Sequence, residues 1–375
     1  MATKNKLRVA TIFSGIGAPE QALIRLSKNF EIIFACDNGD REIDIDYEKE
    51  IEIIKKLSSI KEKQEYADKL YIENTNRHNF VKDSYLANYS KYLKYYFEDV
   101  KLLDGTDFTN KIDLFIGGSP CQSFSIAGAR GGFEDTRGTL FYEFARLVKE
   151  IQPSVFIYEN VYGVLNHDKG KTWQTMQNVF NELGYSFKWS VLDAKDYGIP
   201  QSRRRVFVCG FKDAEKCDKF EFPKKMTLEK TMQYFLEENA AIGSIQSVDG
   251  ELVTVDERKG NPDEKYYLSP KLLAYCLSPG TKNFYHEDAE IDLKVARAIL
   301  STIGNSHRSS VNNYVTTNGR VRALTIREAL RLMGFPDSYV IAVSKAQTYK
   351  QAGNSIVVDV LIQLFKQIFK AEGWR

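Results

Sequence analysis

Short apolar runs alternate with amphipathic stretches through the first half of this 375-residue chain. Leu7–Phe13 and Phe30–Cys36 are typical of buried strands, and the apolar positions of Leu140–Ile151 repeat with the period of a helix. Because strands that alternate with helices form parallel sheets, we predict an α/β fold with a doubly wound, mainly parallel sheet. Such sheets bind their ligands at the carboxyl ends of the strands.

Further runs continue the alternation, and a last helix closes it. We expect strands at Ile112–Gly117, Val155–Tyr158, Tyr185–Leu192 and Val206–Gly210, and helices at Pro19–Ser27 and Thr172–Leu183. An apolar stripe from Ile356 to Ile368 predicts a final helix that packs on the core of the sheet.

Two segments interrupt this pattern. Residues 41 to about 98 are rich in Glu, Lys, Ile and Tyr and hold no Gly or Pro, which predicts a helical insert between two strands. Residues 211–321 are irregular, with scattered Gly, Pro, Asn and Ser. We therefore predict a sheet domain over residues 1–210, a second, smaller domain over 211–321, and a return to the sheet domain over 322–375.

Composition limits the classes of function. The formal net charge is +2 and the pI is near 8.1, so any affinity for nucleic acid must come from local basic clusters. The five cysteines are scattered and form no CxxC pair, which argues against a disulfide framework or a structural zinc site. We expect no metal, no signal peptide, no transmembrane run and a cytoplasmic location.

The first candidate site is the turn Phe13–Gly17, which follows the first predicted strand. Glycines let a ligand approach the backbone, and the next helix directs free N–H groups at it. The same turn is also typical of a plain tight connection. Asp37 ends the second predicted strand, where a carboxylate can either bind a ribose hydroxyl or simply close a turn.

Three further candidates follow later strands. Cys121 stands between Pro120 and polar loop residues, which favours an accessible thiol over a buried apolar one. Glu159 can serve as an acid at a strand end, or as the carboxylate of a helix N-terminus. Arg203 and Arg205 share a face if the strand alternation holds, and could bind a polar base edge, a phosphate or only solvent.

Taken in chain order, these segments resemble the motifs of the cytosine-C5 DNA methyltransferases of bacteria and their phages, almost end to end. The matching segments are Phe13–Gly17, Glu98–Val100, Pro120–Gln122, Arg137–Phe141, Glu159–Val161, Gln201–Arg205, Arg322–Glu328 with Gly334–Asp337, and Gly353–Ser355. The resemblance implies the Rossmann-like methyltransferase fold and an enzyme of the restriction-modification type.

The resemblance also implies S-adenosyl-L-methionine as cofactor and S-adenosyl-L-homocysteine as product. The positions that correspond to cofactor contacts are Phe13, Ser14, Gly15, Ile16, Gly17, Asp37, Asn38, Asp99, Val100, Pro120, Asn354 and Ser355. The chain departs from the family at two of its landmarks. Ala18 and Pro19 replace a third small glycine, and Asn38 stands where an aromatic residue usually stacks on the adenine.

By the same resemblance, the target cytosine is flipped out of double-stranded DNA and Cys121 adds to its C6 atom. Glu159 would hold and protonate N3, while Arg203, with Arg205, would bind the carbonyl oxygen of the base. The smaller domain would read the target sequence, with Ile299 and Leu300 near the family's Thr-Leu pair. The DNA contacts we expect are Gln122, Ser125, Arg130, Arg137, Lys282, His307, Arg308, Asn312 and Asn313.

Three alternatives remain open at this stage. A tRNA-modifying relative shares these motifs, although the sizeable segment 211–321 favours DNA. A catalytically silent DNA-binding protein would not need Cys121, Glu159 and Arg203 together. A nicotinamide-dependent dehydrogenase would need the GxGxxG spacing that the turn at Phe13–Gly17 lacks. We expect a monomer, with a cognate restriction endonuclease acting on the same site without forming a stable complex.

Overall fold

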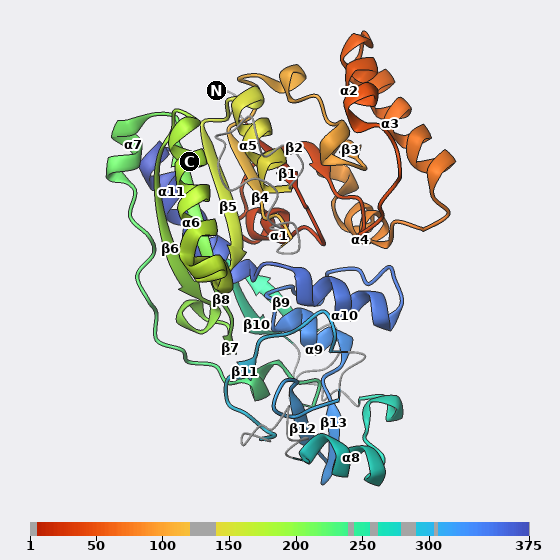
Figure 1. Cartoon of the computed structure of the whole chain (residues 1–375). Helices are drawn as coiled ribbons and strands as arrows, with labels where there is room; N and C mark the ends of the chain where they lie inside the picture. Colours follow the sequence, from red (N-terminus) through yellow and green to blue (C-terminus); the bar gives the residue numbers. More distant parts are fainter. Residues whose placement is uncertain are drawn as a thin grey trace.

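A seven-stranded sheet forms the centre of the molecule (Figure 1). The computed structural model describes residues 6–120, 140–238, 244–255, 262–278, 290–303 and 307–374. The strands lie in the order β3-β2-β1-β4-β5-β8-β6. Their bounds are β1 Leu7–Ile12, β2 Phe30–Cys36, β3 Leu93–Phe97, β4 Leu114–Gly117, β5 Val155–Val161, β6 Ser186–Asp193 and β8 Arg204–Phe211.

The strand directions confirm the predicted mainly parallel sheet. The five strands from β3 to β5 are parallel to their neighbours, whereas β8 runs antiparallel to both β5 and β6. The chain order reverses between β1 and β4, which is the switch point where doubly wound sheets bind ligands.

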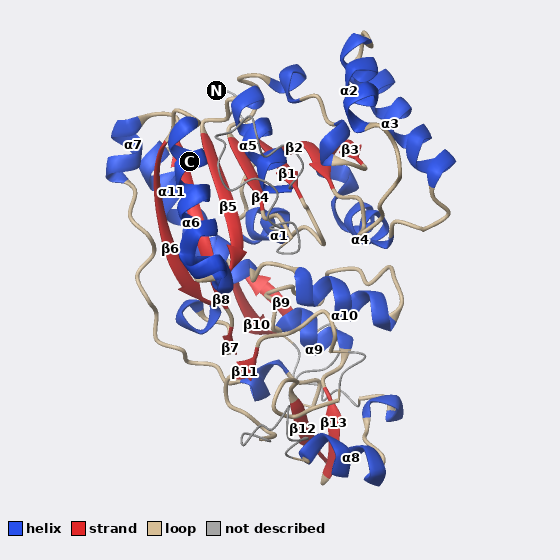
Figure 2. Cartoon of the chain, viewed as in Figure 1, coloured by secondary structure: helices blue, strands red, loops and turns tan. Residues whose placement is uncertain are grey.

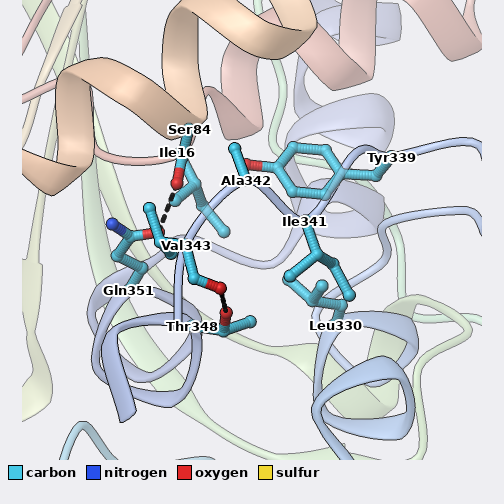
Figure 3. Close-up of a pocket in the computed structure, with 9 residues that line it drawn as sticks. All are labelled: Ile16, Ser84, Leu330, Tyr339, Ile341, Ala342, Val343, Thr348 and Gln351. Atoms are coloured by element: carbon cyan, nitrogen blue, oxygen red, sulfur yellow. Dashed lines mark hydrogen bonds between the residues drawn. The ribbon is translucent and has the colours of Figure 1, made fainter. Parts of the chain in front are cut away.

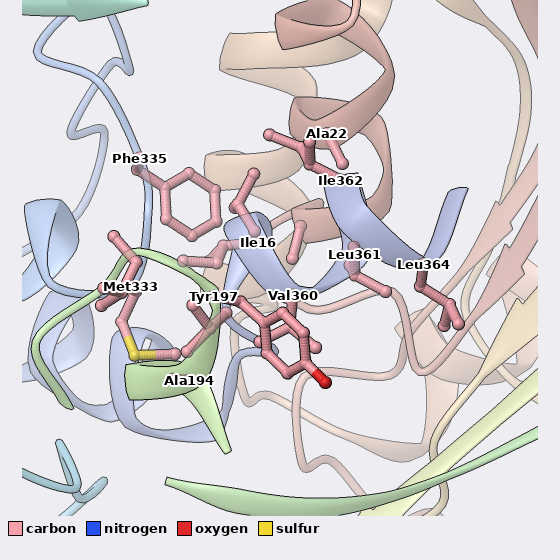
Figure 4. Close-up of a cluster of buried hydrophobic side chains, with 14 of the residues drawn as sticks. Ile16, Ala22, Ala194, Tyr197, Met333, Phe335, Val360, Leu361, Ile362 and Leu364 are labelled. Atoms are coloured by element: carbon pink, nitrogen blue, oxygen red, sulfur yellow. The ribbon is translucent and has the colours of Figure 1, made fainter. Parts of the chain in front are cut away.

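Helices cover both faces of the sheet (Figure 2). Along β5, Val155 and Ile157 belong to one buried cluster, and Phe156 and Tyr158 to another, because successive side chains of a strand point to opposite faces. The first cluster contains α1 (Ala18–Arg25), α4 (Phe80–Tyr89) and α11 (Val358–Glu372). The second contains α5 (Leu140–Ile151) and α6 (Lys171–Glu182). The predicted docking of the final helix on the core is thus confirmed (Figure 4).

The segment predicted as a helical insert holds α2 (Tyr47–Lys56), α3 (Ile60–Asn74) and α4. Ser59 and Glu62 form a capping box that fixes the start of α3. The expected boundary near residue 98 was wrong, because Leu93–Phe97 forms the edge strand β3 of the main sheet. This short aromatic strand follows the helices with only a 3₁₀ turn between them, so no glycine or proline marks the change.

Residues 211–323 hold α7 (Ala214–Lys219), α8 (Pro270–Leu277), the hairpin β9 (Ile245–Val248) with β10 (Glu251–Thr254), and the hairpin β12 (Tyr314–Thr317) with β13 (Arg320–Ala323). Met232, Phe235 and Ile299 from this region belong to the same buried cluster as α1 and α11. The division of the chain into two domains remains a prediction.

Two buried ion pairs hold the following helix, α9 (Ile326–Arg331), one to β13 before it and one to the turn after it. Arg322 pairs with Glu328 at 2.8 Å and Arg331 with Asp337 at 2.7 Å, and all four side chains are fully buried. Arg331 also donates to the carbonyl of Phe235 at 3.0 Å. The segment from Arg322 to Asp337, which matches a family motif, therefore binds residues of the irregular region.

The C-terminal stretch Lys345–Glu372 is long and apolar enough to cross a membrane by composition alone. It consists of two helices, α10 (Lys345–Asn354) and α11, and 72% of its most apolar window is buried inside the protein. A helix buried in a protein core meets the same criterion, so the expected absence of a transmembrane run stays a prediction.

Candidate active site

The predicted motifs lie along one edge of the sheet. Since β3, β2, β1, β4 and β5 are parallel and adjacent, their carboxyl ends meet at the same edge. In spatial order this edge carries Asp99, Asp37, the turn Phe13–Gly17, Pro120 and Glu159. Residues as far apart in numbering as Phe13 and Glu159 thus line a single surface.

The turn after β1 is tight and unusual in its backbone. Phe13, Gly15 and Gly17 all have positive φ angles, of 51°, 53° and 76°. A Cβ atom on Gly17 would lie 2.1 Å from the ring of Tyr89, so only glycine fits there. A positive φ at a phenylalanine is uncommon and often marks a functional site. The side chain of Ile16, a predicted cofactor contact, is buried in the main core cluster (Figure 4).

Asp37 is held by this turn and by its own. The backbone N–H groups of Gly15 and Gly39 each donate to its carboxylate at 2.9 Å. Burial raises the pKa of Asp37 to about 6 despite these hydrogen bonds. The side chain of Asn38 donates to the carbonyl of Arg41 at 2.7 Å, so it serves the turn as well.

Asp99 follows β3 and is surrounded by donors from the insert. Its Oδ2 atom accepts from the phenols of Tyr71 and Tyr47 at 2.7 and 3.0 Å, and its Oδ1 atom from the N–H of Lys101 at 2.9 Å. Sequence reasoning missed both tyrosines, because the insert contains many tyrosines and nothing singles these two out. Val100 beside them is buried in the core.

The approach to the nucleophile motif runs directly past Glu159. A Cβ on Gly118 would lie 2.8 Å from Oε2 of Glu159, so a glycine is needed for this close approach. Asn160 donates to the carbonyl of Ser119 at 3.2 Å and fixes the path of the chain to Pro120, which is exposed. Cys121, Gln122, Ser125, Arg130 and Arg137 lie outside the described residues.

Glu159 belongs to β5 itself, which continues to Val161 instead of ending at Tyr158 as predicted. Because β8 is antiparallel, its first residues reach the same edge, and Arg205 pairs with Val161. Nε of Arg205 lies 3.0 Å from Oε1 of Glu159. Burial raises the pKa of Glu159, while the charges of Arg205 and Arg203 oppose the rise. This carboxyl group can therefore hold a proton more readily than an exposed one.

Arg203 has a different setting from Arg205. It stands between β7 (Gln201–Ser202) and β8, so the strand alternation that would place both arginines on one face is broken. Its two Nη atoms donate to the carbonyls of Ile299, Gly353 and Ser355, at 2.7, 2.7 and 2.8 Å. With only 3% of its surface exposed, Arg203 joins three chain segments.

Residues 69–370 match the family model of the C-5 cytosine-specific DNA methylases. The chain belongs to this family. It is 37% identical to the type II methyltransferase M.HhaI of Haemophilus parahaemolyticus over 251 residues, which cover 66% of this chain and 73% of that protein. It is 36% identical to M.HpaII of Haemophilus parainfluenzae over 283 residues, which cover 70% and 73%. The orphan methyltransferase M.SPRI of Bacillus phage SPR is 28% identical, with 97% of each chain covered.

Solved structures agree on the fold. The methyltransferase EhMeth of Entamoeba histolytica superimposes with a TM-score of 0.63 at 17% identity, covering 98% of each chain. The Dnmt2 methyltransferase of S. pombe gives 0.61 at 16% identity, covering 97% of this chain and 99% of that one. These likenesses confirm the methyltransferase fold, and the family membership makes the protein a DNA (cytosine-5-)-methyltransferase.

Arg203 fixes the last motif of the methyltransferase, Gly353–Ser355, and Gln201 fixes the segment beside it. Gln201 accepts from the N–H of Ile299 at 2.9 Å and donates to the carbonyl of Leu332 at 2.7 Å. Gly353 packs so closely on Leu300 and Ser301 that a Cβ would lie 2.1 Å from a backbone nitrogen. Asn354 is left exposed at the end of α10, while Ser355 is buried. The predicted Ile299–Leu300 segment is therefore a packing element beside the last motif.

The predicted DNA contacts of the smaller region are already engaged within the methyltransferase. The guanidinium of Arg308 lies 3.9 Å from the ring centroid of Tyr275 and donates to the Tyr275 carbonyl at 3.0 Å. His307 lies 3.4 Å from the hydroxyl of Tyr314. Asn312 and Asn313 are buried, and Asn313 bonds both ways to the backbone of Arg297, so these bonds already engage the side chain expected at a base edge. Lys282 lies outside the described residues.

A small pocket lies beside the Gly-rich turn (Figure 3). It is lined by Ile16, by Ser84 of α4 and by Thr348 and Gln351 of α10, and Ser84 donates to Gln351 at 2.8 Å. Glu159 is not among its lining residues. Within the described ranges, no group of three or more His, Cys, Asp or Glu side chains could hold a metal ion.

Proposed function

We propose that this methyltransferase flips a target cytosine out of double-stranded DNA and methylates its C5 atom through a covalent bond between Cys121 and C6. The observation that carries the proposal is the pair of Glu159 and Arg205 at the sheet edge, next to the chain that leads through Pro120 to Cys121. An acid beside a fixed cation at this place fits a polar base edge.

The residues at the other end of the edge fit S-adenosyl-L-methionine. The turn Phe13–Gly17 would let a ligand approach the backbone at Gly15, where a Cβ atom would have no neighbour closer than 4.0 Å. Asp37 would accept from the ribose, and Asp99 would accept from the adenine amino group. Pro120, Asn354 and Ser355 would complete this site. When bound, the cofactor supplies an electrophilic methyl group, and S-adenosyl-L-homocysteine is left after the reaction.

The chain's own groups account for activation of the base. The Cys121 thiolate would form a bond to C6, and Glu159 would give a proton to N3 so that negative charge does not build up on the ring. Arg205 would bind the carbonyl oxygen of the base, while Arg203 would hold the surrounding segments in place. After methylation, solvent water takes the C5 proton, the C–H electron pair expels the Cys121 sulfur as a thiolate and restores the aromatic ring, and the N3 proton returns to Glu159.

We further propose that residues 211–321 read a short target sequence through the major groove, with Lys282, His307 and Arg308 as contacts. Gln122, Ser125, Arg130 and Arg137 would contact the DNA near the flipped base. The enzyme would act as a cytoplasmic monomer, with a restriction endonuclease that acts on the same site as its counterpart.

Expression in a bacterial host without cytosine methylation, followed by bisulfite sequencing, tests the activity and reads out the target. We expect protected cytosines in one short repeated context. If soluble, folded protein leaves no cytosine protected, the proposal of a DNA substrate is wrong, and RNA from the same cells becomes the substrate to examine.

The nucleophile is tested by Cys121→Ala. We expect this variant to lose methyl transfer entirely while it binds the target duplex as the wild type does, because only the bond to C6 is lost. Tritium transfer from labelled cofactor and a gel-shift titration measure the two properties. Cys217→Ala, at a buried cysteine of α7, is the matched control and should remain active. Activity in Cys121→Ala would remove the cysteine from the mechanism.

A further inference from the structure

The helical insert connects the two loops that flank the proposed adenosyl site. The chain enters it from the turn Asp37–Arg41 after β2 and returns through β3 to Glu98 and Asp99. Helices α2, α3 and α4 lie beside β3 at that end of the sheet (Figure 1). Residues of the insert therefore stand where they can bind both loops.

The insert provides two of the three hydrogen bonds that Asp99 accepts within the described part of the chain. The hydroxyl of Tyr71 from α3 and that of Tyr47 from α2 both donate to Oδ2. Each oxygen of a carboxylate has about two acceptor positions, so Oδ2 is filled and Oδ1, which accepts from Lys101, keeps one. Burial and the nearby Asp99 charge raise the pKa of both phenols, so at neutral pH they stay protonated and remain donors.

The insert also holds the other loop. Asn79, the N-cap of α4, donates to the carbonyl of Asp37 at 2.9 Å and to Glu98 at 2.8 Å. A Cβ on Gly39 would lie 2.3 Å from Oδ1 of Asn79, so the two chains are in close contact. Lys82 of α4 pairs with Glu98 at 2.7 Å, and Arg41 pairs with the same carboxylate. One structural unit thus fixes both flanks of the site.

We propose that the insert is a clamp for the adenosyl group, in which Tyr71 and Tyr47 are positioning residues that direct the remaining acceptor of Asp99 at the adenine amino group. This inference rests on the proposed use of S-adenosyl-L-methionine. In the family resemblance an aromatic residue stacks on the adenine, but this chain has Asn38 at that position, and Asn38 is bonded within its own turn. The rigidly placed Asp99 would take over the role of the stacking residue. Preorganised acceptors raise affinity because less freedom is lost on binding.

The test is Tyr47→Phe combined with Tyr71→Phe in the full-length enzyme. Calorimetry measures the dissociation constants of S-adenosyl-L-homocysteine and of its inosyl analogue, which carries a carbonyl oxygen in place of the adenine amino group. We expect about ten-fold weaker binding of the adenosyl compound and less than two-fold change for the inosyl one. The KM for S-adenosyl-L-methionine should rise while kcat stays the same. Tyr66→Phe is the matched control, since Tyr66 of α3 donates to Glu50, within the insert itself.

Each outcome decides the matter. Unchanged binding in the double variant, or equal weakening for both compounds, overturns the clamp. If the double variant does not fold, the half-buried Tyr47→Phe alone decides by the same two constants. If the wild-type enzyme binds neither compound, the proposed use of the cofactor fails and the inference fails with it. Binding by the wild type with no change in the variants overturns the inference alone.

Discussion

Two carboxylates at the same sheet edge have opposite surroundings. Within the described residues Asp99 accepts hydrogen bonds from neutral donors, two phenols and one backbone N–H, which hold it in place. Glu159 faces the guanidinium of Arg205, and burial raises its pKa while that charge opposes the rise. An acid that only orients a ligand is served by fixed neutral donors, whereas one that exchanges a proton needs competing influences on its ionisation. We call Asp37 and Asp99 the proposed cofactor half of the edge, and Glu159 and Arg205 the proposed base half. Mutations in the cofactor half should therefore weaken cofactor binding, and mutations in the base half should slow methyl transfer.

The largest effect that we expect from this comparison is that of Glu159→Gln. The amide keeps the shape of the side chain but cannot give a proton to N3, so we expect single-turnover methyl transfer to fall about 10²- to 10⁴-fold. Binding of S-adenosyl-L-homocysteine should stay within two-fold of the wild type, because Glu159 lies at the base half. Rapid-quench measurements with saturating DNA and calorimetry give the two values.

Glu182→Gln is the control for this change, because Glu182 is exposed at the end of α6, away from the site. It should leave both values unchanged. A Glu159→Gln enzyme with wild-type rate would mean that N3 receives its proton from another group. A loss confined to cofactor binding would mean that the two halves of the edge are not separable.

The second comparison separates the two arginines of one motif. Lysine cannot reach the three carbonyls that Arg203 binds, so we expect Arg203→Lys to lower the free energy of unfolding by about 2–4 kcal/mol. Arg205→Lys keeps a charge near Glu159 but loses the planar donor pair. It should slow methyl transfer about 10- to 100-fold and change stability by less than about 1 kcal/mol. Urea denaturation and single-turnover kinetics measure these effects.

Arg204→Lys gives the matched control, because Arg204 lies between the two and places its guanidinium 4.2 Å from the ring centroid of Tyr162 at the exposed surface. It should change neither the equilibrium constant of unfolding nor the rate of methyl transfer by more than two-fold. The division of roles is refuted if Arg203→Lys slows methyl transfer without lowering the free energy of unfolding. It is also refuted if Arg205→Lys unfolds at a lower urea concentration than Arg203→Lys.

The strands and the edge were predictable because they rest on local patterns. Apolar runs gave β1 and β2 within a residue, and parallel pairing then placed Asp37 and Glu159 on one edge without any long-range information. The position of Glu159 inside β5 was missed, because a charged residue usually closes a strand, and here Arg205 of the antiparallel β8 meets its charge.

The roles of Arg203, Tyr47 and Tyr71 could not be predicted, because each depends on partners that are distant in the sequence. A buried arginine needs acceptors for its donors, and the carbonyls of Ile299, Gly353 and Ser355 converge on Arg203 only after folding. The helical pattern of the insert shows amphipathic helices but does not show which of its tyrosines would reach Asp99.

The smallest expected effect concerns Asp37, at the cofactor half. Its carboxylate has a pKa raised to about 6 by burial, and the proposed ribose contact needs the ionised acceptor. As the pH falls from 7 to 5, we expect the dissociation constant of S-adenosyl-L-homocysteine to rise by up to about ten-fold, since each pH unit below the pKa gives a ten-fold loss of the ionised form. Calorimetry across this range measures the change.

Folding without ligand should show the opposite sign. The folded protein holds this proton more tightly than the unfolded chain, so the contribution of Asp37 to stability is present at low pH and is lost as the pH rises through about 6. In Asp37→Asn the binding constant should be weaker at pH 7 and should no longer change between pH 5 and 7. If the wild-type dissociation constant does not change over this range, Asp37 does not bind the ribose. Asp99, held by its neutral donors, must then recognise the nucleoside.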